Sequence, residues 1–180
     1  MQRIPVITSQ PVSSNICAPS TGATFSVIAT GVTSYQWQVN DGSGWVNVSN
    51  GGVYSGATTA NLVISNAVTT AYDGYLYRVQ LSSTGYRCSP VNSDAATLRV
   101  FTGAPATPGA ITGNVTVCPS IIAVYSITPV AQAISYNWTV PAGWSIISAA
   151  SSSTVTVLTA ASGSGNVRVT APNTCGTSPA

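Results

Sequence analysis

Charge is the scarcest feature of this 180-residue sequence, which has no lysine, no glutamate and no histidine. Charged residues make up 4% of the chain, against roughly 25% in an ordinary soluble domain. Without histidine, the side chain that most often moves protons near neutral pH is missing. Three isolated aspartates do not form the facing pair of carboxylates that glycoside hydrolysis needs. The sequence therefore predicts a protein that is not an enzyme and that needs no cofactor.

The same shortage of charge argues against several classes of ligand. No CxxC spacing marks a zinc site, and no acidic cluster marks a calcium site, so we expect no bound metal. Five scattered arginines and a net charge of +2 would neutralise few phosphates, so we expect no nucleic-acid binding. No run of about 18 apolar residues is present, which predicts no membrane insertion.

Apolar side chains are plentiful, and they recur at every second position along most of the chain. This alternation is typical of β-strands that bury one face. It is clearest in residues 25–29, 35–39, 62–64, 75–81 and 96–100, and again in 125–127, 136–140, 155–157 and 167–171. Turn clusters rich in Gly, Asn and Asp separate these segments. The pattern predicts an all-β fold of β-sandwich type, with seven or so short strands per unit.

One motif occurs twice at the same offset. SYQWQV at 34–39 and SYNWTV at 135–140 are 101 residues apart, and so are Cys17 and Cys118. This repetition predicts two consecutive sandwiches. We place their boundary at the Pro- and Gly-rich stretch between them: a first domain at 1–102, a linker at 103–109 and a second domain at 110–180.

The four cysteines permit three pairings, and their spacing alone does not select one. The repeat offset favours a disulfide within each unit, Cys17 with Cys88 and Cys118 with Cys175. Buried free thiols in a cytosolic protein are the alternative. A loop of the size closed by Cys17 and Cys88 corresponds to about 4 kcal/mol in the chain-entropy model.

Two aromatic positions point to the immunoglobulin type of sandwich. Trp37 and Trp138 stand where such a sandwich places the tryptophan of its third strand. Tyr77 follows a Tyr-Asp-Gly turn, as in a tyrosine corner, so its hydroxyl is expected to bond back to that corner. The cysteines depart from the antibody pattern, because Val79 occupies the strand position where antibody domains have one.

At this point the sequence resembles known families. YQWQVNDGSGWVNVSNGGVYSGATTANLVISN, followed by DGYLYRV, resembles the immunoglobulin-like repeats of secreted and cell-surface proteins of Bacteroidota-type bacteria, over roughly residues 5–101. PGAITGNVTVCPS, SYNWTVPAGWSIIS and SGNVRVTAPNTCGTS resemble the PKD-like domain often found beside them. The resemblance implies adhesins, gliding-associated surface proteins or secreted polysaccharide-degrading enzymes, and export by the type IX system. It also implies an extracellular or cell-surface location.

The second unit stops where the family pattern would continue into a final strand. We therefore expect its sandwich to lack the last strand and to have an open edge. A truncated chain explains this simply. The alternative is that a strand from another copy fills the gap, as in donor-strand complementation.

Sugar binding is the functional candidate that the composition allows. Aromatics outside the core positions could stack on pyranose rings: Trp45, Tyr54, Tyr86 and Trp144. The competing interpretation is that Trp45 and Trp144, which both follow a glycine turn, cover the ends of the sandwiches.

We therefore expect a non-enzymatic extracellular structural or adhesive module, acting as a disulfide-locked spacer and interaction segment of a large surface protein or filament. Its expected partners are neighbouring repeats, copies of the same protein and surface glycans. One alternative is an accessory module of a secreted carbohydrate-active enzyme. Another is a subunit of an ordered extracellular fibre, for which the low charge and the open edge are suitable.

Overall fold

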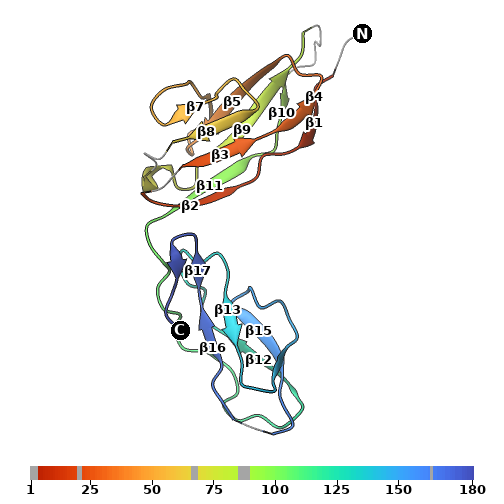
Figure 1. Ribbon diagram of the computed structural model, residues 1–180, viewed down its shortest axis with the longest axis vertical. Coiled ribbons are helices and arrows are strands. Elements are labelled where there is room, and N and C mark those ends of the chain that lie inside the picture. Colours follow the sequence, from red (N-terminus) through yellow and green to blue (C-terminus); the bar gives the residue numbers. More distant parts are fainter. Residues whose placement is uncertain (1–3, 20–21, 66–68, 85–89, 163) are drawn as a thin grey trace. The chain divides into compact units, whose positions relative to one another are not determined.

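The computed structural model describes residues 4–19, 22–65, 69–84, 90–162 and 164–180. The chain divides into two compact units, Met1–Thr102 and Gly103–Ala180, whose strands can be followed in Figure 1. In the described residues, the strands are accompanied only by one short 3-10 helix, η1 at Thr70–Tyr72. None of these residues forms a helix with the length and hydropathy needed to span a bilayer. The all-β class predicted from the alternating pattern is confirmed.

The first unit has a larger and a smaller sheet. The larger sheet has the strand order β2-β11-β9-β5-β6, with β10 also paired to β9, and the smaller has the order β3-β8-β7. β1 pairs with β4, and β2 runs parallel to β11. The strand bounds are β1 Val6–Ser9, β2 Ser14–Cys17, β3 Ala23–Ser26, β4 Ile28–Thr30, β5 Ser34–Asn40, β6 Trp45–Asn47, β7 Tyr54–Ser55, β8 Asn61–Ile64, β9 Leu76–Ser82, β10 Val91–Asn92 and β11 Ala96–Phe101.

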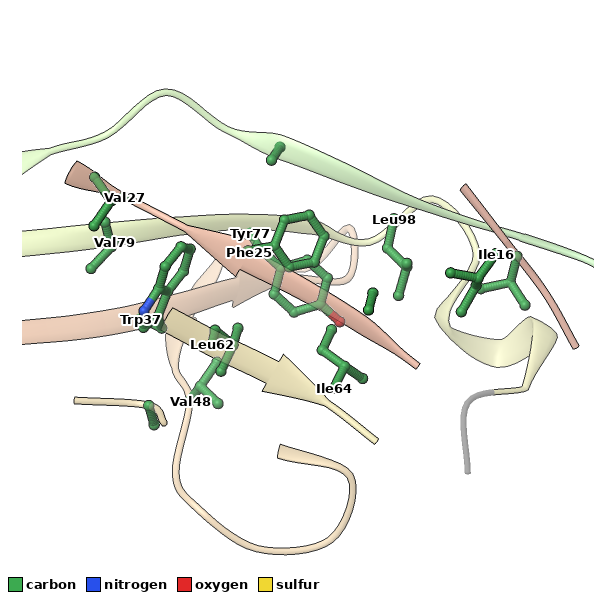
Figure 2. Packing of buried hydrophobic residues seen from close by; sticks show 14 of the residues in the cluster. Ile16, Phe25, Val27, Trp37, Val48, Leu62, Ile64, Tyr77, Val79 and Leu98 are labelled. Carbon is green, nitrogen blue, oxygen red and sulfur yellow. The ribbon is translucent and has the colours of Figure 1, made fainter. Parts of the chain in front are cut away.

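The core of the first unit lies between these two sheets. β5 and β9 pair along their whole length, with Trp37 directly opposite Val79, and both side chains are fully buried. From the smaller sheet, Phe25 stacks on Tyr77 with 4.9 Å between the ring centroids (Figure 2). Each large apolar side chain buried in this way contributes about 1.5–3 kcal/mol to folding. The alternating residues of the sequence therefore form the core that their period predicts.

The hydroxyl of the buried Tyr77 has a different partner from the one expected at a tyrosine corner. It lies 3.1 Å from the hydroxyl of Tyr54 on β7, which belongs to the smaller sheet. Among the described residues, this bond replaces the predicted bond back to the preceding corner. Burial, together with the bond to Tyr54, raises the pKa of Tyr77 well above its ordinary value. Burial also raises the pKa of Tyr54.

The second unit is a smaller arrangement of the same kind. One sheet has the order β12-β15-β14, and the other pairs β13 with β16. Its core consists mainly of Tyr125, Trp138, Val155, Val157 and Val169. The strand bounds are β12 Ile122–Ser126, β13 Asn137–Thr139, β14 Ser145–Ile146, β15 Thr154–Leu158, β16 Arg168–Thr170, β17 Pro172–Asn173 and β18 Gly176–Thr177.

The segment after β16 forms the hairpin β17–β18. Within the described residues, β16 pairs with β13 alone, so no further strand lies along its other side. The hairpin is tied to the start of the unit, because the side-chain amide of Asn173 donates to the carbonyls of Gly103, at 2.8 Å, and Gln132, at 3.2 Å. The first residue of the predicted linker is therefore held within the second unit.

The repeated tryptophan has the same hydrogen bond in both units. Trp37 Nε1 donates to the carbonyl of Thr59, and Trp138 Nε1 donates to the carbonyl of Ser152, each at 2.9 Å. Both acceptors lie in the turn just before a strand of the opposite sheet, β8 or β15. In both turns the hydroxyl of the acceptor residue also donates to the carbonyl two residues later. The two sandwiches therefore share one tryptophan-to-turn bond between their sheets.

We predict that Trp37→Phe and Trp138→Phe each lower the free energy of unfolding of their own unit by roughly 2 kcal/mol. Each loses a buried hydrogen bond, leaves a carbonyl unpaired and opens a small cavity. Guanidinium unfolding followed by circular dichroism measures the change. Trp45→Phe, on the outer face of the sheet, is the matched control and should cost less than about 0.5 kcal/mol. Equal losses for Trp37→Phe and Trp45→Phe would contradict the assignment.

We predict that the first unit loses stability as the pH rises above about 10, the ordinary pKa of tyrosine. The phenols of Tyr77 and Tyr54 have raised pKa values in the folded state. The unfolded chain therefore loses its protons first, and the stabilisation present below that pH is lost above it. Each tyrosine contributes at most about 1.4 kcal/mol per pH unit. Unfolding titrations at pH 9 to about 11 should show a shallower decline for Tyr77→Phe, and an unchanged slope would refute the prediction.

Candidate functional site

Two of the three described carboxylates, those of Asp41 and Asp73, are engaged in local structure. In the β5–β6 turn, Asp41 accepts from the Ser43 hydroxyl and from its backbone N–H, which lowers the pKa of Asp41. Asp73, which follows η1, accepts from Arg99 Nε at 3.1 Å and from the N–H of Val100 at 2.8 Å. Asp94 lies in the short segment between β10 and β11. In the part of the chain that the structure describes, no three cysteines or aspartates form a cluster that could hold a metal ion.

Trp45 was predicted as a possible sugar contact, but its ring already has a partner. The Arg78 guanidinium carbon lies 4.1 Å from the ring centroid. Arg78 is held there by Gln38, which accepts from Arg78 Nε at 2.9 Å and donates to Asn47 Oδ1 at 2.9 Å. These residues lie opposite one another on β9, β5 and β6, so they form a polar ladder across the sheet. The ladder and its cation–π contact hold Trp45 against the first unit.

Tyr54 is also used internally. Besides its bond to Tyr77, it packs edge-on against Tyr72 with 6.4 Å between the ring centroids. Tyr86, the third predicted aromatic, lies outside the described residues. Of the predicted aromatics that the structure describes, Trp45 and Tyr54 are thus engaged in contacts within the first unit.

Trp144 differs from Trp45 and Tyr54, because it lines a cavity in the second unit. The backbone N–H of Trp144 donates to the carbonyl of Pro141, closing a turn in which Gly143 has φ +82°. The turn places the half-buried ring beside Tyr125 of β12, with 6.2 Å between centroids and 31° between the ring planes. The cavity has a volume of about 450 Å³, within the range typical of ligand pockets.

Two loops form the walls of this cavity, at 111–117 and 164–167. The first loop passes closely over the Tyr125 ring, because a Cβ atom on Gly113 would lie 2.3 Å from a ring carbon. The Tyr125 hydroxyl donates to the carbonyl of Asn114 at 3.0 Å and fixes the loop to the ring. The alternating pattern predicts Tyr125 as a core residue, and it does not mark the loop asparagines as binding residues. Asparagine is common in loops, so nothing in the sequence distinguishes those that line a cavity.

The cavity has aromatic and uncharged polar groups. Asn114, Thr116, Ser164 and Asn166 contribute amides and hydroxyls, and in the described chain these side chains have no hydrogen-bond partner. An adjoining hollow of about 270 Å³ shares Ile111, Asn166 and Val167 with it and is also lined by Arg168. Such groups suit stacking and hydrogen bonding with a bound molecule.

The cysteines correct one predicted pairing. Cys118 is an exposed free thiol, whereas Cys175 is disulfide-bonded, so the predicted bond between them is wrong. Cys118 precedes β12, where its carbonyl accepts from Thr159 after β15, and Cys175 lies in the β17–β18 turn. The repeat offset could not reveal that these segments belong to different sheets. Cys17 is also disulfide-bonded. Cys88, its predicted partner, lies outside the described residues.

A known protein family matches the chain. The model of the PKD-like domain matches residues 4–73 and 104–180, which together make up most of the chain. It thus matches within both units, including the one whose sequence resembles immunoglobulin-like repeats. No curated relative matches the chain at significant similarity.

Solved structures that are similar to the chain include several built of immunoglobulin domains. The N-terminal four Ig domains of Dscam1 isoform 6.44 match with a TM-score of 0.59 and 13% identity, over 95% of this chain and 47% of that one. Those of isoform 7.44 match with a TM-score of 0.57 and 13% identity, over 98% and 49%. A titin structure of domains I67–I69 matches with a TM-score of 0.46 and 18% identity, over 98% and 63%. The chain spans about half the length of the Dscam1 structures. At such identities the Dscam1 matches show the fold alone.

We predict that an alkylating agent modifies Cys118 in the native, unreduced protein. Its thiol is exposed and free, whereas Cys17 and Cys175 are disulfide-bonded and should react only after reduction. Peptide mass spectrometry after iodoacetamide treatment measures this, with Cys118→Ser as the control. Protection of Cys118, or labelling of Cys175 without reductant, would contradict the assignment.

Proposed function

We infer the function from one premise: this chain belongs to the PKD-like domain family. We propose that it is a non-enzymatic structural and adhesive module of a larger extracellular protein. In that role the two units act as a spacer and present surfaces to neighbouring repeats, to copies of the same protein or to glycans. We also propose export by the type IX route, which the sequence resemblance implies.

The observation that carries this proposal is the arrangement of two self-contained sandwiches in series. Each has its own core and its own tryptophan-to-turn bond between sheets. Modules of this kind set reach by repetition, because each folds on its own contacts. The polar groups of the first unit, such as the Arg78 ladder and the Asp73–Arg99 pair, serve the fold. Because these polar groups stabilise the first unit itself, they support a mechanical role.

The disulfide-bonded state of Cys17 and Cys175 supports a location outside the cytosol. Disulfides persist in oxidising compartments and are rare where glutathione keeps thiols reduced. The low charge fits the same location, since a nearly neutral surface repels its neighbours weakly.

A second role is favoured by one observation, the cavity beside Trp144. A module that binds polymer could hold a catalytic domain of a secreted enzyme near its substrate. In this alternative the chain is an accessory module of a carbohydrate-active enzyme. The longer reading frame that contains the chain distinguishes the two roles, because only the second requires a hydrolase domain.

We predict that an antibody raised against the purified chain labels intact cells of the natural source, or detects the chain in their medium. Added in solution, the purified chain should reduce attachment of those cells to surfaces, because it competes for the same contacts. The control is a preparation unfolded in guanidinium and alkylated. Antigen found only after lysis, or attachment unaffected by the folded chain, would overturn the proposal.

A further inference from the structure

We propose that the cavity formed by Trp144, Tyr125 and the loops 111–117 and 164–167 binds a neutral saccharide, with one pyranose ring packed on Trp144. This inference goes beyond the mechanical role and does not depend on it, because a sandwich can bind a sugar whatever protein contains it. It rests on the volume of the cavity, the state of its aromatic ring, its free hydrogen-bonding groups and its lack of charge.

The Trp144 ring differs from the other tryptophans in its contacts. The core tryptophans Trp37 and Trp138 donate their indole N–H groups to carbonyls, and Trp45 is covered by Arg78. Trp144 is only half-buried, and its indole N–H has no partner among the described residues. A π-face carries partial negative charge, so it attracts the slightly positive C–H groups on the face of a pyranose. Trp144 therefore offers both an aromatic surface and a free donor.

The polar groups at the rim of the cavity also indicate the kind of ligand. Asn114 lies on one of the two wall loops and Asn166 on the other, and their side-chain amides have no partner in the described chain. Each amide presents a donor and an acceptor, which matches a sugar hydroxyl that both donates and accepts. A purely apolar ligand would leave these amides without partners, which costs free energy when they lose water. The rim thus favours a ligand with many hydroxyls.

The lack of charge around the cavity favours a neutral ligand. Among the described residues that line the cavity, none is an aspartate or an arginine. Residues 103–180 contain a single charged side chain, Arg168, which lines the adjoining hollow. A phosphate or a polyanion would need several cations, and a cationic ligand would need carboxylates. The shared wall at Asn166 gives a longer saccharide room to continue toward Arg168.

The geometry of the cavity is held by contacts that do not use its binding groups. Tyr125 is 6% exposed and fixes the first loop through its hydroxyl, while Gly113 allows the close approach. On the other wall, a Cβ atom on Gly165 would lie 2.8 Å from the Pro141 side chain, so that loop also packs closely. The walls are thus held in place without a ligand, which lowers the ordering cost of binding.

The test is a titration of the full chain with neutral oligosaccharides, namely cellohexaose, xylohexaose, mannohexaose and chitohexaose, with polygalacturonate as the acidic comparison. Nuclear magnetic resonance follows the four indole N–H signals, and Trp144→Phe assigns the signal of Trp144. At least one neutral probe should shift the Trp144 signal and leave those of Trp37 and Trp138 in place. Trp144→Ala should weaken the affinity by about tenfold or more, because the stacking surface is lost.

The matched control is Trp45→Ala, which removes an aromatic of the other unit and should leave the affinity unchanged. Asn166→Ala changes an exposed side chain, so it should fold normally and weaken binding severalfold. No shift with any neutral probe would overturn the proposal. So would affinity that survives Trp144→Ala, or binding of polygalacturonate alone. Surface labelling of cells does not depend on these results, so failure here leaves the mechanical role standing.

Discussion

Each unit depends on a tryptophan buried between its two layers and hydrogen-bonded to the layer opposite. Trp37 reaches the carbonyl of Thr59, and Trp138 reaches that of Ser152. A buried indole N–H without a partner would cost free energy, so the ring and the turn hold each other at one separation. This bond sets the spacing of the sheets, and the period-two side chains fill the space between them. The inter-sheet bond recurs although the intervening loops differ in length.

The near absence of charge determines how the rest of the molecule can interact. In the first unit several of the described ions are engaged at short range, as in the Asp73–Arg99 pair and the contact of Arg78 with Trp45. In the second unit Arg168 stands alone. Amides and hydroxyls therefore carry most of the polar chemistry of the surface. Such groups suit other uncharged surfaces and sugars, where directional hydrogen bonds replace long-range attraction.

Two similar sequence contexts lead to different outcomes at Trp45 and Trp144. Both residues follow a glycine in a turn, so local sequence cannot separate them. Strand pairing brings Arg78 of β9 over the ring of Trp45, whereas two loops leave a cavity beside the ring of Trp144. The difference comes from residues distant in the chain. It is therefore a property of the packing, which a single sequence does not reveal.

Alternation and motif spacing are local properties of the chain, so they were enough to predict the all-β class, the doubled unit, the core positions and the two central tryptophans. The free thiol of Cys118, the bond of Tyr77 to Tyr54 and the cavity beside Trp144 became evident only from the folded chain. Those features depend on which strand ends and loops meet in space. Such meetings are set by loop paths and sheet order, for which residue periodicity carries no signal.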